Sequence, residues 1–478
     1  MKTRLSFACL FMLATLLDVS FTCRAATLVV TNLADSGPGT LRQSIVDAQP
    51  GDTITFTNTL SGQGIILTNG QLIIPTNLTI DASNLVGGLT INGAGSYSIF
   101  EIAAGSVVTL DSLTLTNGFG GEGGAILVDT GGTLTLNNSM LTGNSVPTGQ
   151  GGGGIFNNGT LTLNNSTLSG NSAAYGGSGG GIFNYGTLTL NNTKLSGNSA
   201  PYGSGGGIDN YFGGVTTIND CTLSSNSTPS GVGGGIENSG ALTLNNSTLA
   251  GNSTPSGFGG GIFNSGLLTI NNSTLTGNSA TVNSGVGGGI YNVSGSPSGT
   301  LALTNTIVAG NTDSSGYPNI YGSFSGADNL TNGVPLLALL GNYGGPTQTM
   351  PPLIGSPAID AGDDSVTNFL AADQRGYPRL SGAHVDIGAV EAQLTPANDR
   401  PRLMNSAWIT VGGTNSFQFT FTNIADADFT ALASTNVALP LTDWTVLGNI
   451  TETSPGWYLF TDPSVTNYPQ RFYEVVSP

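Results

Sequence analysis

The sequence predicts an all-β protein whose main part is a single-stranded parallel β-helix, and three observations predict it. An isoleucine closes a glycine run every 26 to 28 residues, an asparagine follows two residues later each time, and a Leu-Thr-Leu-type strand comes next. A fixed period of this length indicates a stacked solenoid, because one unit cannot bury its apolar face alone. The isoleucines are Ile155, Ile182, Ile208, Ile236, Ile262 and Ile290.

Composition excludes several classes of partner. The formal net charge is −17, only 8% of the residues are charged, and the 478 residues include 10 Lys and Arg. Binding to nucleic acid needs a basic face that neutralises phosphates, and anionic lipid needs one too, so neither is an expected partner. Regularly spaced Leu, Ile and Thr argue against a disordered chain in spite of the 74 glycines.

The N-terminus predicts export. A basic start, an apolar run over residues 5–17 and small residues ending at Ala25 are typical of a secretory signal peptide, so we expect residues 1–25 to be removed. The run is too short for a membrane span, and no transmembrane segment is expected in the mature chain. The expected location is therefore secreted or cell surface. A lipoprotein cut at Cys23 fits poorly, because Phe21 and Thr22 precede it.

Removal of this peptide would leave Cys221 as the only cysteine, so no intrachain disulfide is expected. Cys221 occupies a position where other units have serine. We interpret it as a packed small side chain rather than a nucleophile.

Residues 26–60 are expected to form an N-terminal cap. A strand at 27–31 precedes a short helix with Thr40 as its N-cap and with Leu41, Ile45 and Ala48 on one face. The first coil of a solenoid needs such a cover, because its backbone and apolar side chains have no preceding coil.

Each following unit contains three short strands: Gly-Ile-x-Asn, Leu-Thr-Leu and Thr-Leu-Ser-Gly. They predict one solenoid turn per unit over residues 26–392, and roughly ten turns stacked at about 4.8 Å give a rod on the order of 50 Å long. The same residue then lies above itself in every turn. Asparagines at the corners are expected to form amide ladders, which explains them without any ligand.

The repeat pattern of the sequence ends near the C-terminus. Residues 356–391 are rich in charge and are expected to close the C-terminal end of the rod as an end block. A Pro-containing linker over 393–402 separates it from a small β domain at 403–478. That domain contains all three tryptophans, and Phe417, Phe419 and Phe421 alternate within it.

The repeats resemble those of secreted β-helix proteins related to polymorphic outer membrane proteins, whose Gly-Gly-Ala-Ile marker stands at Gly123–Ile126. The Phe-x-x-Asn marker of that family is not kept, and Phe156-Asn157 is the nearest match. The resemblance implies a right-handed, pectate-lyase-like β-helix on an exported or surface protein. It implies no particular activity.

Two further resemblances cover the C-terminal part. The end block is similar to the choice-of-anchor domain that ends many bacterial β-helix surface proteins, through residues 356–362, 373–379 and 385–391. The last module resembles a domain recurrent in secreted proteins of Verrucomicrobia and relatives, through Trp444, Gly448, Gly456, Tyr458, Phe460, Asp462 and Arg471 to Tyr473.

One position of the repeat changes its chemical character from unit to unit. The residue between the isoleucine and the asparagine is expected to point outward, and we call this position the slot. Asp209 and Glu237 occupy it in adjacent turns, with a backbone spacing near 5 Å. Aromatic residues occupy it in the other units: Phe156, Phe183, Phe263 and Tyr291.

The slot has two interpretations. An acid pair flanked by aromatic sugar platforms could catalyse glycoside hydrolysis with Asp209 and Glu237, or a solvated stripe could carry two acidic substitutions. Asp220 replaces an asparagine in the Asp209 turn. Lys194 is the one basic residue of the periodic section, so a lyase base is hard to place.

Calcium was considered because the chain is acidic. The end block offers oxygen ligands, but capping and ion pairs with Arg375 and Arg379 are the favoured interpretation. No other cofactor is expected, since the glycine runs lack the lysine and helix of a phosphate loop. The carboxylates in question are Asp360, Asp363, Asp364, Asp373 and Asp386, and the single histidine, His384, lies among them.

Two hypotheses of function follow. The first is a non-catalytic, adhesin-like surface protein that binds an extracellular glycan or a surface protein along one flank, through the slot residues and the variable loops beside them. The alternative is a polysaccharide-active hydrolase or lyase that uses Asp209 and Glu237.

Overall fold

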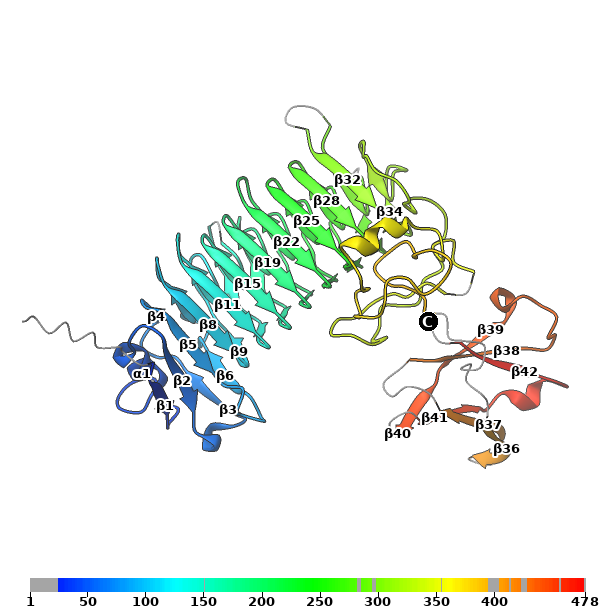
Figure 1. The fold of residues 1–478 in the computed structure, drawn as a ribbon, viewed down its shortest axis with the longest axis horizontal. Helices are drawn as coiled ribbons and strands as arrows, with labels where there is room; N and C mark the ends of the chain where they lie inside the picture. The colour runs from blue at the N-terminus through cyan, green and yellow to red at the C-terminus, as the bar shows by residue number, and fades with distance from the viewer. Residues whose placement is uncertain are drawn as a thin grey trace, which may run out of the picture.

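The computed structural model is a parallel β-solenoid of about 11 turns, followed by small antiparallel sheets (Figure 1). It describes residues 25–149, 151–281, 285–294, 298–353, 355–393, 404–411, 414–422, 428–454 and 457–476. The predicted signal peptide, apart from Ala25, and all but the first residue of the predicted linker lie outside the described residues.

Three parallel sheets form the walls of the solenoid, and each receives one strand per turn. Sheet A contains β1 (Thr27–Val30), β2 (Asp52–Phe56), β5 (Leu78–Asp81), β8 (Val107–Asp111), β11 (Thr133–Asn137), β15 (Thr160–Asn164), β19 (Thr187–Asn191), β22 (Val215–Asn219), β25 (Ala241–Asn245), β28 (Leu267–Asn271) and β32 (Thr300–Thr304).

Sheet B follows each sheet A strand around a tight corner. Its strands are β3 (Gln63–Ile66), β6 (Leu89–Asn92), β9 (Leu113–Thr116), β12 (Met140–Thr142), β16 (Thr167–Ser169), β20 (Lys194–Ser196), β23 (Thr222–Ser224), β26 (Thr248–Ala250), β29 (Thr274–Thr276) and β33 (Ile307–Val308).

Sheet C holds the isoleucine strands. They are β4 (Leu72–Ile74), β7 (Phe100–Ile102), β10 (Ile126–Val128), β14 (Ile155–Asn157), β18 (Ile182–Asn184), β21 (Ile208–Asn210), β24 (Ile236–Asn238), β27 (Ile262–Asn264), β31 (Ile290–Asn292) and β35 (Ile320–Tyr321). Two minor pairs lie between sheets B and C: β13 (Ser145–Val146) with β17 (Ser172–Ala173), and β30 (Ser279–Ala280) with β34 (Thr312–Asp313).

The core and the amide ladders agree with the prediction from the repeat. Leu161 and Leu163 point inward and are fully buried, and they stack on Leu188 and Leu190 of the next turn. At the corner after sheet B, each buried asparagine donates from Nδ2 to Oδ1 of the next one at 2.9 Å, from Asn144 onward to Asn311. A second ladder runs at the end of the sheet C strands, from Asn157 to Asn292.

The predicted cap helix is α1 (Leu41–Asp47). The Thr40 side chain accepts a hydrogen bond from the backbone N–H of Gln43, and Leu41 and Ile45 are buried in the solenoid core. The helix contacts β1, β2 and β4 of the first turns. One 3₁₀ turn, η1 (Asn58–Leu60), follows it.

The end block does more than close the end of the rod. Ile387 and Ala358 pack against Ile307 of the last turn, but other contacts reach several turns back along sheet B. The Gln374 side chain binds Thr248 and Thr222, which are 126 and 152 residues away in the sequence. The segment therefore folds back over the side of the solenoid (Figure 1). Its 3₁₀ turn η2 (Asp364–Asn368) follows the N-cap residue Asp363, which exchanges hydrogen bonds with Asn305 of the last turn.

The C-terminal residues form two antiparallel sheets with an aromatic core around Phe419, Phe421, Phe429 and Tyr458. One contains β36 (Met404–Val411), β37 (Thr414–Thr422), β41 (Trp457–Asp462) and β40 (Thr451–Ser454), and the other contains β39 (Thr445–Asn449), β38 (Thr430–Ser434) and β42 (Phe472–Val476). A 3₁₀ turn, η3 (Leu441–Asp443), lies between β38 and β39 of the second sheet, and another, η4 (Val465–Asn467), lies between β41 of the first sheet and β42 of the second.

Candidate functional site

The slot residues form one continuous column on the outward side of sheet C. In-register pairing places each directly beside the next, in the order Phe156, Phe183, Asp209, Glu237, Phe263, Tyr291 and Tyr321. The isoleucine before and the asparagine after each slot residue point into the solenoid, so the slot side chain points out. The structure thus brings all six predicted site residues together on one flank.

The two halves of the column differ in exposure. Phe156 and Phe183 are only 7% and 1% exposed, and Asp209 and Glu237 only 3% and 7%. Phe263 and Tyr291 are half-buried. The expectation of a solvated stripe is therefore wrong for Phe183 and for the two acids, although all of them point outward.

Two tyrosines, each two residues after a slot residue in the sequence, cover the buried half of the column. Tyr185 packs edge-on against Phe183 with ring centroids 4.9 Å apart, and Tyr211 packs on Tyr185 at 4.7 Å. Sequence reasoning missed these two residues. The sequence does distinguish them, because Tyr185 and Tyr211 directly follow the asparagines that recur in consecutive units, at a position where other units have Asn, Ser or Val.

The exposed half is a stack of parallel rings. Phe263 and Tyr291 lie 5.3 Å apart between ring centroids at an angle of 4°, and Tyr291 and Tyr321 lie 4.8 Å apart at 9°. Phe258 packs beside Tyr291 at 4.9 Å. A second exposed stack lies in the loops next to this flank, where Tyr175 and Tyr202 are 5.5 Å apart.

Asp209 and Glu237 form a buried carboxyl pair. Burial raises the pKa of Asp209 well above its usual value, and the neighbouring charge of Glu237 raises it further. Burial also raises the pKa of Glu237, which accepts a hydrogen bond from the Ser239 hydroxyl at 2.6 Å. The Glu237 carboxyl raises the pKa of Asp209 and the nearby Ser178 hydroxyl lowers it, and Asp209 Oδ1 is buried with no hydrogen-bond partner among the described residues.

This geometry limits the chemistry of the pair. Retaining and inverting glycosidases hold their carboxyls about 5 Å or more apart, because the anomeric carbon or a water lies between them. Asp209 and Glu237 are only 3% and 7% exposed, so in this structure no sugar can lie against both carboxyls. Burial raises the pKa of both groups, which favours a protonated member of the pair.

The buried pair makes stability depend on pH. A folded-state pKa raised above the ordinary aspartate value of 3.8 means that the folded chain binds more protons than the unfolded chain above pH 3.8, so the free energy of unfolding falls as pH rises through that window. We expect Asp209→Asn, which keeps a polar side chain of the same shape beside Glu237, to flatten this dependence and to raise the melting temperature at neutral pH. Thermal unfolding from about pH 4 to about pH 8 measures it.

The exposed Asp328 supplies the control for this measurement. Asp328→Asn should leave the pH profile of wild type unchanged. Equal profiles for wild type and Asp209→Asn would show that the pair does not hold an extra proton in the folded state.

The end-block carboxylates do not converge on a metal site. Asp373 binds Arg375 at 2.8 Å, Asp364 binds His384 at 3.0 Å, and Asp363 caps η2. Asp386 accepts backbone hydrogen bonds from Asp360 and Ala392. Within the described ranges, no group of three or more His, Cys, Asp or Glu residues is placed to hold a metal ion.

Two other predicted positions have structural partners. Cys221 is fully buried, its thiol bonds the Asn219 carbonyl at 3.0 Å, and burial raises its pKa to about 12, which suppresses the nucleophilic thiolate. Asp220 lies under the end block, near Arg379, and burial raises its pKa to about 6.

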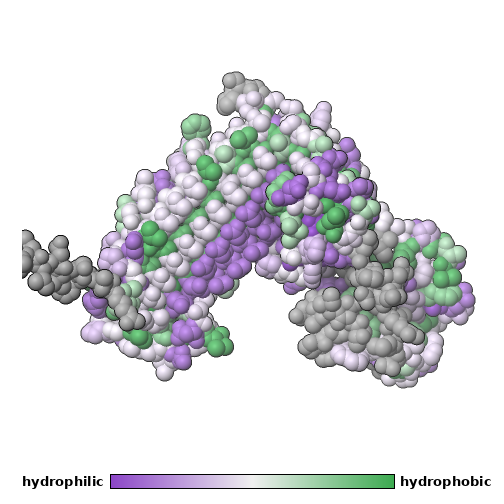
Figure 2. Space-filling view, in the orientation of Figure 1, coloured by the Kyte–Doolittle hydropathy of each residue, from purple (hydrophilic) through white to green (hydrophobic). Residues whose placement is uncertain are grey.

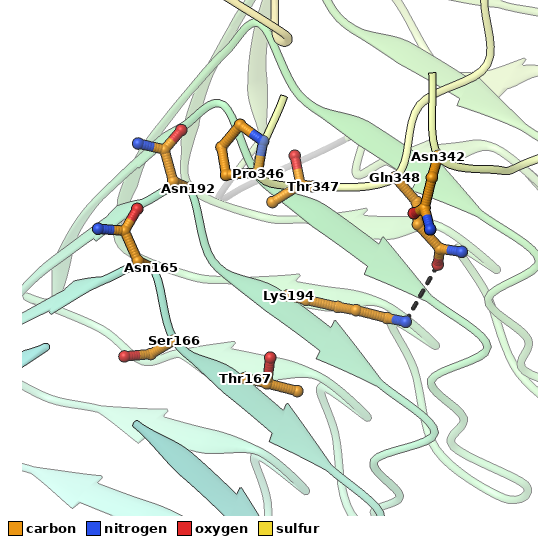
Figure 3. A pocket seen from close by; sticks show the side chains of 9 residues that line it. All are labelled: Asn165, Ser166, Thr167, Asn192, Lys194, Asn342, Pro346, Thr347 and Gln348. Carbon is orange, nitrogen blue, oxygen red and sulfur yellow. Dashed lines mark hydrogen bonds between the residues drawn. The ribbon is translucent and has the colours of Figure 1, made fainter. Parts of the chain in front are cut away.

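A polar crevice of about 280 Å³ lies where residues 342–348, which precede the end block, meet sheet B (Figure 3). The Lys194 ammonium donates to Gln348 Oε1 at 3.0 Å at its edge, and Asn165, Asn192 and Thr167 line the other side. Sequence reasoning did not anticipate this site, because segments more than 150 residues apart form it.

These observations define the class of the protein as an all-parallel β-solenoid with a buried carboxyl pair set in an aromatic column. Comparison of the chain with models of known protein families and with curated protein sequences gives no match. Among the described residues, no helix has the length and the hydropathy that crossing a bilayer requires.

Proposed function

We propose that this protein is an adhesin-like, non-catalytic surface protein that binds an extracellular glycan along the flank of sheet C. The observation that carries the proposal is the half-exposed stack of Phe263, Tyr291 and Tyr321, whose nearly parallel rings repeat once per turn. Pyranose rings present apolar C–H faces that pack on aromatic faces, and the repeat distance offers successive platforms to an extended chain.

The surroundings of the stack support a neutral or basic sugar rather than an acidic one. Glu237 lies directly beside Phe263, and further along the same flank stands Glu101, whose pKa burial and the nearby Asp129 and Glu122 raise. A polyanionic glycan would be repelled by this flank and by the net charge of −17.

Export and anchoring belong to the same proposal. The predicted signal peptide over residues 1–25 supports a secreted or surface location, and the resemblance to polymorphic outer membrane protein repeats, to a choice-of-anchor end block and to a verrucomicrobial C-terminal domain supports a bacterial envelope. N-terminal sequencing of the secreted protein would test the cut after Ala25.

A binding assay against a panel of insoluble and soluble polysaccharides tests the function. Because one aromatic contact contributes about 0.5–1.5 kcal/mol, Tyr291→Ala should weaken glycan binding by up to about tenfold, and Phe263→Ala should do the same. Phe369→Ala removes an exposed aromatic side chain from the end block and is the matched control, with binding expected to equal wild type.

The same assay decides against the alternative of a polysaccharide-active enzyme. The burial of Asp209 and the raised pKa values of the pair are features that catalytic acids share, so new reducing or unsaturated ends must be scored beside binding. Product that disappears in Asp209→Asn would establish an enzyme and refute the non-catalytic proposal. Binding without product, lost in Tyr291→Ala, would refute the enzyme.

A further inference from the structure

The outward face of sheet A carries a lattice of threonines that the proposed glycan flank does not use. In-register pairing stacks one threonine on the next over ten successive strands. The column consists of Thr27, Thr53, Thr79, Thr109, Thr135, Thr162, Thr189, Thr217, Thr243 and Thr269.

Two parallel columns widen this lattice. On one side, Thr133, Thr160 and Thr187 pair in register, so that three consecutive turns present Thr-x-Thr. On the other side lies a column of asparagines. These asparagines are Asn137, Asn164, Asn191, Asn219, Asn245 and Asn271.

The face is open to solvent and its hydroxyls are unused. The strands from β11 to β32 all show a buried inward residue alternating with exposed or half-buried outward ones, so neither a loop nor the end block covers the face. Within the described residues, the hydroxyls of Thr135, Thr162 and Thr189 make no hydrogen bond, whereas that of Thr193, at the corner, bonds the Asn191 carbonyl at 2.9 Å.

The face is also neutral. From β11 to β32, every outward position of sheet A is Thr, Asn, Val, Ala or Leu, and none is charged. High β-propensity explains threonine at such positions, but it does not explain the absence of Lys and Glu, which protect exposed sheets from unwanted contacts. Figure 2 shows the result as a hydrophilic band with a paler band beside it, both running along the rod.

The asparagine column holds the lattice spacing. Each Nδ2 donates to Oδ1 of the preceding turn at 2.9 Å, from Asn164 through Asn271. Together with the backbone ladders, these bonds fix the repeat between turns at about 4.7–4.9 Å. A rigid repeating surface pays little entropy on binding, provided that its partner repeats on the same scale.

Ice is a neutral solid that repeats on this scale. Oxygens joined by O–H···O bonds of about 2.7–2.8 Å at the tetrahedral angle lie about 4.5 Å from their next-nearest oxygens, within about a tenth of the separation between solenoid turns. Threonine suits such a partner, because its hydroxyl joins the water network while its methyl group removes apolar surface from liquid water. An ionic mineral would need charges, and the aromatic platforms for sugars lie on sheet C.

We propose that the sheet A face binds ice, through the threonine column and the asparagine column beside it. The bound protein blocks the addition of water to the crystal plane beneath it. Ice growth then stops over an interval below the melting point.

The test uses the purified full chain in a nanolitre osmometer and in an ice recrystallisation assay. Wild type should shape ice crystals, hold their growth below the melting point and keep grains small. Thr162→Lys, in the middle of the column, places a long hydrated side chain on the face and should abolish most of this activity. Thr243→Lys, three turns further on, is an independent second variant.

Ser169→Lys is the matched control, because it introduces the same side chain at an outward position of sheet B, two residues from Thr167, whose in-register neighbour in the next turn is Lys194. It should retain the wild-type activity, and circular dichroism should show the same unfolding temperature for all variants. Wild type without any effect on ice growth would overturn the proposal. Equal losses of ice-growth inhibition in Ser169→Lys and Thr162→Lys would also overturn it. A third contrary result would be a wild-type protein that binds crystalline polysaccharide but not ice, with the polysaccharide binding abolished in Thr162→Lys.

Discussion

Arg379→Met is expected to release the end block from the side of the solenoid and to lower the free energy of unfolding of that region by about 3–5 kcal/mol. Arg379 is fully buried. Its guanidinium donates to the carbonyls of Gly388 and Ala389 at 2.9 and 3.1 Å and to Asn246 Oδ1 at 2.6 Å. It therefore links the end block to a corner of the solenoid 133 residues earlier in the sequence, beside the bond from Asn246 Nδ2 to the Ala372 carbonyl and the Gln374 contacts.

The loss is large because acidic groups surround this arginine. The carboxyls of Asp373, Glu391, Asp386 and Asp220 all interact with it, and burial raises the pKa of Glu391 to about 7. Arg375 still pairs with Asp373 in the variant, but Asp220, Asp386 and Glu391 lose the nearest buried cation. Protonation relieves the repulsion, so the deficit of Arg379→Met relative to wild type should shrink as pH falls from about 7 toward about 5.

Limited proteolysis and hydrogen exchange over residues 330–393 measure the release. Cleavage there should accelerate in Arg379→Met while the solenoid strands keep their protection. Arg42→Met removes an arginine paired with Asp35 at the other end of the rod and should leave the end block resistant. An Arg379→Met protein with wild-type protection over 330–393 would contradict this role.

The sequence was sufficient for the solenoid because the repeat encodes every stacked position. Ile155, Leu161 and Leu168 mark the three strands of one turn, and each reappears in the next, so strand number, register and inward face follow from the period. The cap helix could be predicted from Thr40 and three apolar residues. These signals are local in the sequence, and the structures that they predict depend on the same short segments.

The burial of the site could not be predicted in the same way. Alternation correctly places Asp209 on the outward side, but Tyr185, Tyr211 and the loop with Ser178 then cover that side, and alternation carries no information about loops. The crevice at Lys194 was missed for a related reason. Gln348 reaches it by a chain reversal across more than 150 residues, for which the repeat has no counterpart.

The amide ladders lead to the second large effect, which Asn198→Leu should reveal. Asn198 is fully buried; its Nδ2 donates to the Leu168 carbonyl at 3.0 Å and to Asn226 Oδ1 at 2.9 Å, and its Oδ1 accepts from the backbone N–H and the Nδ2 of Asn171. Leucine removes all four bonds in a buried site. Asn226 Oδ1 keeps its bond from the backbone N–H of residue 198, and Asn171 Nδ2 keeps its bond to the Leu141 carbonyl, so the Asn171 backbone N–H and the Leu168 carbonyl lose most. At about 1–3 kcal/mol for each unsatisfied buried group, partly offset by local relaxation, we expect a loss on the order of 4 kcal/mol.

Asn191 in the same turn provides a control with the same chemistry and different burial. It belongs to the outer ladder, where Nδ2 donates to Asn164 Oδ1 at 2.9 Å, but it is only half-buried, so water replaces the lost bonds in Asn191→Leu. That variant should lose less than about 1 kcal/mol. Chemical denaturation of both variants gives the comparison. Similar losses in the free energy of unfolding would mean that burial of the amide makes no difference. A much larger loss for Asn198→Leu would show that the buried ladder stabilises the solenoid because water cannot replace its hydrogen bonds.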